Sequence, residues 1–226
     1  MRHNRQTMVG KTVVLAGARH FLLTLVLLPL VFCSSPAEEV PEKEVEPVVD
    51  SETPAEPEGI PYAILDTDKG SITVKLRPDV APETVKNFID LAEVGFYRRT
   101  SFHRVIRDRL IQGGDPNSRD NNPYNDGQGG SGRTIKAEFS SMPFQRGTVA
   151  MARQPSFPDS ASSQFFICLQ RVPQWDGDYI IFGEVVEGIE VAQEISRVKT
   201  SEQPQLRERP TGKIYLKDVR IEYRQE

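Results

Sequence analysis

Alternating apolar and polar residues predict a β-hairpin after the first quarter of the chain. Residues 72–76 read Ile-Thr-Val-Lys-Leu, with the period of two that a half-buried strand requires. Residues 62–65 are a second apolar run, and the turn-forming residues Asp68, Lys69 and Gly70 separate the two. We therefore expect two adjacent antiparallel strands at the start of a folded domain that begins near Ile60.

Two segments show helical periodicity instead. Apolar residues follow the i, i+3, i+4, i+7 spacing at Val85, Phe88, Ile89 and Ala92. Pro and Glu at positions 82 and 83 suit the first turn of a helix, because proline lacks an N–H and an acid complements the helix dipole. A glycine at position 95 ends the helix. Residues 189–198 form a second amphipathic helix.

The remaining apolar runs are short and separated by turns. We expect strands at residues 102–106, 110–112, 148–151, 165–169, 181–186 and 214–223. In the last of these, apolar residues occupy 214 and 216 and then 219, 221 and 223, and the extra residue predicts a β-bulge. About eight strands with two helices favour a mainly β fold, a closed barrel capped by the helices, because closure removes exposed strand edges.

The N-terminal residues resemble an export signal. Arg and Lys residues precede an apolar run over residues 21–32, which is short for a membrane span of about 20 residues. The run ends at Cys33, as in a bacterial lipoprotein signal, although Phe32 stands where a small residue is usual. Residues 1–33 are thus read as a signal peptide or lipoprotein signal with Cys33 lipidated. An uncleaved anchor, cleavage near Ala37, and Cys33 as an ordinary apolar residue stay open.

Residues 34–59 are rich in Pro, Glu and Val and contain no aromatic residue. Such a segment buries too little apolar surface to offset the loss of chain entropy on folding. We expect a disordered tether between a membrane and a domain at residues 60–226. This organisation places the domain in the cell envelope, on the periplasmic side and tethered to the membrane.

Composition excludes several classes of function. The net charge of −4 and the scattered Lys and Arg residues argue against nucleic acid as a partner. The only two cysteines are Cys33 and Cys168, so a disulfide framework is not expected. His103 is the single histidine after residue 20, which leaves little material for a histidine metal site or a Ser-His triad.

Three segments carry the most specific signal. The first is Phe-His-Arg-Val-Ile at 102–106 with Leu-Ile-Gln-Gly-Gly-Asp-Pro at 110–116. The second is Gly-Thr-Val-Ala-Met-Ala at 147–152 with Ser-Ser-Gln-Phe-Phe-Ile at 162–167, and the third is Trp-Asp-Gly-Asp-Tyr at 175–179 with Phe-Gly-Glu-Val at 182–185. Together they resemble the cyclophilin family of peptidyl-prolyl isomerases, especially its bacterial members, over about residues 60–226. The resemblance implies an eight-stranded antiparallel barrel capped by two helices.

The chemistry of this family fits the residue types. Rotation about a peptide bond has a barrier of about 18–20 kcal/mol, and no covalent bond to the enzyme is needed to lower it. The twisted amide gains a lone pair on the proline nitrogen, which a permanently charged guanidinium can stabilise. The resemblance implies the catalytic residues Arg104, Gln112 and Phe166 and the substrate-binding residues Leu110, Ala152, Arg153, Gln164, Trp175 and Tyr179. It implies no cofactor and no metal.

Three positions depart from the family pattern. Arg109 stands where the proline pocket usually has Phe, and it either folds outward with its alkyl stem over the pocket or disrupts the pocket. Gln174 and Trp175 stand where eukaryotic-type members often carry Trp and Leu. Arg153 replaces a usual Asn, a residue that works largely through its backbone.

Other motifs have weaker explanations. The Gly-rich residues 127–134 superficially fit a phosphate-binding loop but follow no expected strand. Ser160 to Ser163 has no histidine to serve a nucleophile, and Cys168 reads as a buried apolar residue. The sequence therefore predicts a monomeric isomerase acting on proline-containing segments of unfolded or exported proteins. A proline-binding module with weak or no catalysis, and a structural envelope protein, are the alternatives.

Overall fold

The computed structural model describes residues 58–225. The expected signal, Cys33 and residues 34–57 of the expected tether lie outside the described residues. No helix among residues 58–225 is long and apolar enough to cross a membrane. Two α-helices, α1 (Pro82–Glu93) and α2 (Ile189–Ser196), accompany a single β-sheet.

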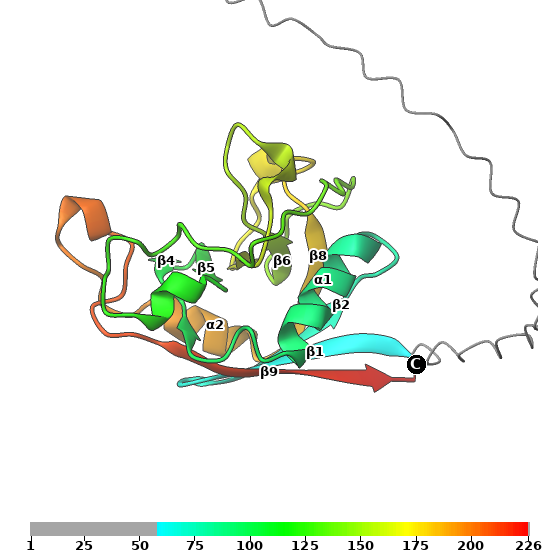
Figure 1. Ribbon diagram of the computed structural model, residues 1–226, viewed down its shortest axis with the longest axis horizontal. Coiled ribbons are helices and arrows are strands. Elements are labelled where there is room, and N and C mark those ends of the chain that lie inside the picture. Colours follow the sequence, from blue (N-terminus) through cyan, green and yellow to red (C-terminus); the bar gives the residue numbers. More distant parts are fainter. Residues whose placement is uncertain (1–57, 226) are drawn as a thin grey trace, which may run out of the picture. The chain divides into compact units, whose positions relative to one another are not determined.

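All nine strands of residues 58–225 belong to one antiparallel sheet, in the order β3-β9-β1-β2-β8-β6-β7-β5-β4. Figure 1 shows β9 running alongside β1. Their bounds are β1 Ile60–Thr67, β2 Gly70–Leu76, β3 Thr100–Ser101, β4 Arg104–Ile106, β5 Leu110–Gly113, β6 Thr148–Met151, β7 Phe165–Cys168, β8 Ile181–Glu187 and β9 Tyr215–Arg224. The predicted hairpin is β1–β2, in which Tyr62 lies opposite Lys75 and Leu65 opposite Ile72.

The predicted closed eight-stranded barrel is wrong, because the sheet is an open half-barrel of nine strands. Of the expected strand 102–106, only residues 104–106 form a strand, β4, and it pairs only with β5, whereas the short strand β3 precedes the expected one and pairs only with β9. Phe102 and His103 carry the chain between the two edge strands. The edges bond to the connection before β9 instead of to each other, through Phe102 N to Ile214 O (3.0 Å) and Val105 N to Glu208 O (2.7 Å). Strands of two and three residues are too short to form a second ladder.

The predicted bulge in the last strand is confirmed. Asp66 of β1 lies opposite Asp218, but the next residue, Thr67, lies opposite Leu216. Lys217 is therefore the extra residue. It shifts the apolar set from even to odd positions, so that Leu216 and Val219 are both buried.

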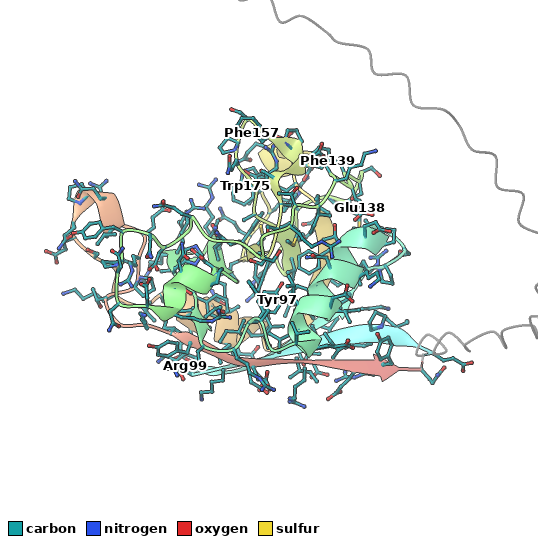
Figure 2. All side chains as sticks on the ribbon, in the orientation of Figure 1. Tyr97, Arg99, Glu138, Phe139, Phe157 and Trp175 are labelled. Carbon is teal, nitrogen blue, oxygen red and sulfur yellow. The ribbon has the colours of Figure 1, made fainter. Side chains whose placement is uncertain are left out.

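Both predicted helices form. At the start of α1, the backbone N–H groups of Glu83 and Thr84 donate to the carboxylate of Glu138, at 3.1 and 2.8 Å. This distant acid satisfies groups that the helix leaves unpaired. Figure 2 shows Glu138 beside this N-terminal end of α1. Helix α1 packs against β9, whereas α2 packs against β2, β4 and β5.

The alternation of side chains on β6, β7 and β8 separates two apolar clusters. Val149, Phe165, Ile167 and Phe182 belong to the main core beneath α1, together with Phe88 and Tyr97. Ala150, Phe166, Cys168 and Ile181 point to the opposite face and form a second cluster with Phe144 and Val172. Trp175 and Tyr179 pack against this second cluster, which supports the surface described next.

Candidate functional site

Strand register places three predicted catalytic residues in one row. Arg104 of β4 lies directly opposite Gln112 of β5, and Gln112 lies opposite Phe166 of β7. Residues that face each other across antiparallel strands project from the same side of the sheet. Leu110 is two residues from Gln112 and therefore shares this side. The sequence segments that are far apart along the chain thus contribute to one surface.

Hydrogen bonds fix the polar half of this row. Nη1 of Arg104 donates to Oε1 of Gln112 at 3.2 Å, and Nε2 of Gln112 donates to Oε1 of Gln164 at 2.9 Å. Gln164 in turn donates to the carbonyl of Gly129 at 2.8 Å. On its other edge, Arg104 donates through Nε to Oε2 of Glu208 at 2.5 Å. The guanidinium is therefore held from two sides, and its Nη2 makes no hydrogen bond within residues 58–225.

The apolar half of the row has an aromatic floor. The ring of Phe166 stacks on Phe144 at 6.0 Å and meets the edges of Trp175 and Tyr179 at 5.5 and 5.4 Å. Trp175, labelled in Figure 2, ends the short 3₁₀ helix η3 (Pro173–Trp175). The rings of Trp175 and Tyr179 stand close to perpendicular to that of Phe166, an arrangement that aromatic side chains favour. The result is a rigid apolar surface beside a fixed cation.

A groove of about 830 Å³ runs over this surface. Its lining includes eight of the nine residues that the sequence proposes for the site: Arg104, Leu110, Gln112, Ala152, Arg153, Phe166, Trp175 and Tyr179. The ninth, Gln164, is buried behind Gln112 and reaches the groove through the hydrogen bond described above. Its carbonyl accepts from Ala152 N at 2.9 Å, which ties the two together.

Arg109 does not line the groove. Its guanidinium lies over the ring of Trp175, with Cζ 5.2 Å from the ring centroid, and its Nε has no hydrogen-bond partner among residues 58–225. The side chain thus packs against Trp175 with its Nε buried, so it neither enters the groove nor covers the pocket with its alkyl stem. Gln174, the neighbouring departure, is exposed, whereas the Trp175 ring faces the groove.

Sequence reasoning missed one whole wall of the groove. The connection between α2 and β9 contributes Pro204, Gln205, Leu206, Arg207, Glu208 and Arg209, and the loop after β5 contributes Pro123, Tyr124, Asp126, Gly127 and Gln128. An ion pair between Arg209 and Asp126 (2.6 Å) joins the two loops, and both side chains are largely buried. Neither loop has a periodic pattern, and Glu208 is 104 residues from the arginine it pairs with, so no sequence signal identified them.

His103 also lines the groove, next to Arg104. Its side chain is buried, and neither ring nitrogen has a hydrogen-bond partner among residues 58–225. Burial lowers the pKa of this imidazole, and the carboxylates of Asp115 and Asp126 oppose only part of that effect. His103 is therefore neutral at pH 7 and adds no charge beside Arg104.

The weaker motifs have structural explanations. Cys168 is buried and unpaired, and burial raises the pKa of its thiol to about 12, so its interpretation as an apolar residue is confirmed. Within the Gly-rich residues 127–134, Gly129 accepts the hydrogen bond from Gln164. Ser163 is buried and donates to the carbonyl of Gly114 at 2.9 Å. Residues 58–225 contain no group of three acidic, histidine or cysteine side chains placed to bind a metal.

A groove with a rigid apolar floor and polar sides is typical of a site that binds a polypeptide segment. Comparison with known proteins agrees. Residues 62–221 match the family model described as Cyclophilin type peptidyl-prolyl cis-trans isomerase/CLD. The chain therefore belongs to the cyclophilin-type peptidyl-prolyl cis-trans isomerases.

Individual relatives support this assignment. A peptidyl-prolyl cis-trans isomerase of Helicobacter pylori is 39% identical over 140 residues, which cover 60% of this chain and 80% of that protein. Peptidyl-prolyl cis-trans isomerase-like 2 of Gibberella zeae is 34% identical over 167 residues, 71% of this chain, which spans only 26% of that protein. A Cryptosporidium parvum cyclophilin type isomerase, solved in the presence of dipeptide ala-pro, has 30% identity and a TM-score of 0.64, covering 72% of this chain and 99% of that one.

Proposed function

We propose that this chain catalyses cis/trans isomerisation before proline in exported polypeptides, with Arg104 as the catalytic residue. One observation carries the mechanism: a guanidinium held by Gln112 and Glu208 stands in register with an aromatic floor. Phe166 and Leu110 receive the proline ring, and Arg104 faces the amide beside it. Ala152, Arg153 and Gln164 border the flanking backbone, and Trp175 and Tyr179 flank the proline ring beside Phe166.

The barrier falls because the groove favours the twisted amide over both planar forms. As the amide twists, resonance is lost and the proline nitrogen gains a lone pair. The free Nη2 of Arg104 donates a hydrogen bond to that lone pair. The guanidinium is held in place before the reaction, so it does not have to reorganise as the amide twists. Such preorganisation is the main source of electrostatic catalysis. Gln112 accepts from Arg104 and is itself fixed by Gln164, so the side of the groove is rigid.

The proposed place of action rests on the N-terminal sequence. A basic segment, a short apolar run and Cys33 support export and lipidation, and the Pro- and Glu-rich residues that follow support a tether. Exported chains arrive unfolded, and uncatalysed Xaa-Pro exchange takes tens of seconds or more. An isomerase fixed on the periplasmic side of the membrane would meet these chains as they fold.

Exchange NMR on an Ala-Pro peptide tests the activity. We expect the native chain to speed the exchange of cis and trans signals, and Arg109→Phe is measured beside it. An inert native chain with an active Arg109→Phe variant would show that Arg109 spoils the pocket. In that case the chain would be a binding module instead of an enzyme.

Detergent partitioning and mass spectrometry test the location. A lipidated mature N-terminus at Cys33 predicts partition into the detergent phase and a mass increase equal to the lipid. Cys33→Ala is expected to move the chain to the aqueous phase. A native chain that stays aqueous, with an unmodified N-terminus, would refute the lipid anchor while leaving the enzymatic proposal intact.

A further inference from the structure

Trp175 and Tyr179 form what is here called the aromatic wall of the groove. Both residues line the groove, and their ring centroids lie 5.8 Å apart. Both rings also contact Phe166, which forms the floor. Because the two rings pack against each other and against Phe166, the aromatic wall is rigid. The ring faces that are not packed in this way are available to other side chains.

Two arginines stack on this wall. Arg109 lies over Trp175, and Arg153 lies over Tyr179 with Cζ 4.9 Å from the ring centroid. Arg153 is anchored further by hydrogen bonds to the carbonyls of Asp178 (2.8 Å), Gln154 (3.1 Å) and Pro155 (2.7 Å). Stacking on an aromatic ring holds each guanidinium group, and hydrogen bonds to carbonyl groups hold that of Arg153 as well, without neutralising either charge.

Neither arginine forms an ion pair with a carboxylate among residues 58–225. The two acids that line the groove are already paired, Glu208 with Arg104 at 2.5 Å and Asp126 with Arg209 at 2.6 Å. The wall is therefore a site of uncompensated positive charge in a chain whose net charge is −4. Both arginines stack on the aromatic wall, but only Arg153 lines the groove itself, whereas Arg109 acts on it from beside Trp175.

We propose that the aromatic wall makes this isomerase selective for proline segments that carry Asp or Glu beside the Xaa-Pro bond. This inference rests on the proposed function and names its preferred substrates. A carboxylate near a half-exposed arginine gains modest Coulomb energy in water, and the gain is greater beside a low-dielectric aromatic surface. Salt weakens such attraction because the Debye length is about 10 Å at 0.1 M. We expect a preference of about fivefold at low ionic strength, equivalent to ~1 kcal/mol.

The chain carries its own reporter for this test. Trp175 is the only tryptophan in the sequence, so fluorescence excited selectively at tryptophan, and not at the six tyrosines, reports on the wall. Full-length chain is titrated with two peptides, Ala-Ala-Pro-Ala and Glu-Ala-Pro-Glu, both capped at their ends, at low and high salt. Arg109→Gln and Arg153→Gln remove each cation. Arg146→Gln is the matched control, because Arg146 also lacks an ion pair within residues 58–225 but bonds to Gln193 and does not line the groove.

The acidic peptide is expected to bind about fivefold more tightly than the neutral one at low salt. High salt and each wall substitution should reduce that ratio, and Arg146→Gln should preserve it. Equal affinities, or a ratio that survives both wall substitutions, would overturn the proposal. Exchange NMR on the same peptides separates the acidic preference from the enzymatic activity. Catalysis without a preference for the acidic peptide refutes only this inference. A preference for the acidic peptide without catalysis refutes only the proposed enzymatic function.

Discussion

Replacing Glu208 by alanine is expected to slow isomerisation, because it releases one of the two groups that hold Arg104. The carboxylate of Glu208 accepts from Nε of Arg104 at 2.5 Å, and the backbone carbonyl of Glu208 accepts from Val105 N at 2.7 Å. Only the side chain is lost in Glu208→Ala, so the backbone bond that fixes this connection to β4 remains. Among residues 58–225, Gln112 then becomes the sole hydrogen-bond partner of the guanidinium.

The size of the effect follows from the exposure of the pair. The side chains of Arg104 and Glu208 are 41% and 45% exposed, so solvent screens their attraction. Exposed ion pairs of this kind contribute about 0.2–1 kcal/mol. The negative charge of Glu208 also opposes the action of Arg104 on the substrate. For full charges ~6 Å apart in water that opposition is about 0.7 kcal/mol, and only a fraction of a charge develops on the proline nitrogen. In the upper part of that range anchoring outweighs repulsion, and kcat/KM should fall by at most about fivefold, the equivalent of ~1 kcal/mol.

Exchange NMR and steady-state kinetics measure this effect directly. Glu208→Gln keeps an oxygen acceptor for Arg104 and should lose less activity than Glu208→Ala. Glu202→Gln is the matched control, since Glu202 lies in the same connection, is almost fully exposed and does not line the groove. A Glu208→Ala variant as fast as the native chain, or faster, would show that the carboxylate restrains Arg104 instead of positioning it.

Three further predictions concern stability. Tyr97 is fully buried beside α1 (Figure 2) and its hydroxyl has no partner among residues 58–225, so Tyr97→Phe should raise the unfolding free energy in urea by about 1 kcal/mol; a decrease would contradict this. Burial lowers the pKa of His103, so as pH falls below about 6.5 the imidazole is protonated in the unfolded chain before it is protonated in the folded one. The unfolding free energy should therefore decline with pH until the lower folded pKa is reached, by at most ~1.4 kcal/mol per pH unit. A His103→Asn variant that kept this decline would show that another group causes it. Gly114 has φ +82°, and a Cβ there would lie 2.5 Å from Ser163 O, so Gly114→Ala should lower the thermal midpoint, and an unchanged midpoint would show that the loop adapts.

Local periodicity was sufficient to predict most elements of the fold. The two helices, the first hairpin and the bulge at Lys217 all follow from apolar spacing in the sequence. The short strand β3, and the shortening of the expected strand 102–106 to residues 104–106, could not be predicted in this way. Thr100 and Ser101 pair with β9, and the next strand begins only at Arg104, because the chain crosses between sheet edges at Phe102 and His103. Tertiary contacts decide which partner each short strand pairs with. For that reason the prediction of a closed eight-stranded barrel was wrong.

The groove shows the same division. The side that contains Phe166, Gln112 and Arg104 comes from regular strands, whose register brings motif residues together. The opposite side comes from irregular connections held by pairs such as Arg209 with Asp126. Such long-range pairs leave no periodic trace in the sequence. The orientation of Arg109 over Trp175 likewise depended on a neighbour 66 positions away.

The most direct test of this account is the exchange rate of an Ala-Pro peptide with Arg104→Ala beside the native chain. Removing one preorganised donor to developing charge typically costs about 10²–10³ in rate. We therefore expect Arg104→Ala to lose most of the catalysis while the variant keeps its fold and still binds the peptide, as Trp175 fluorescence can show. Native-like exchange in Arg104→Ala would contradict the assignment of Arg104 as the catalytic residue.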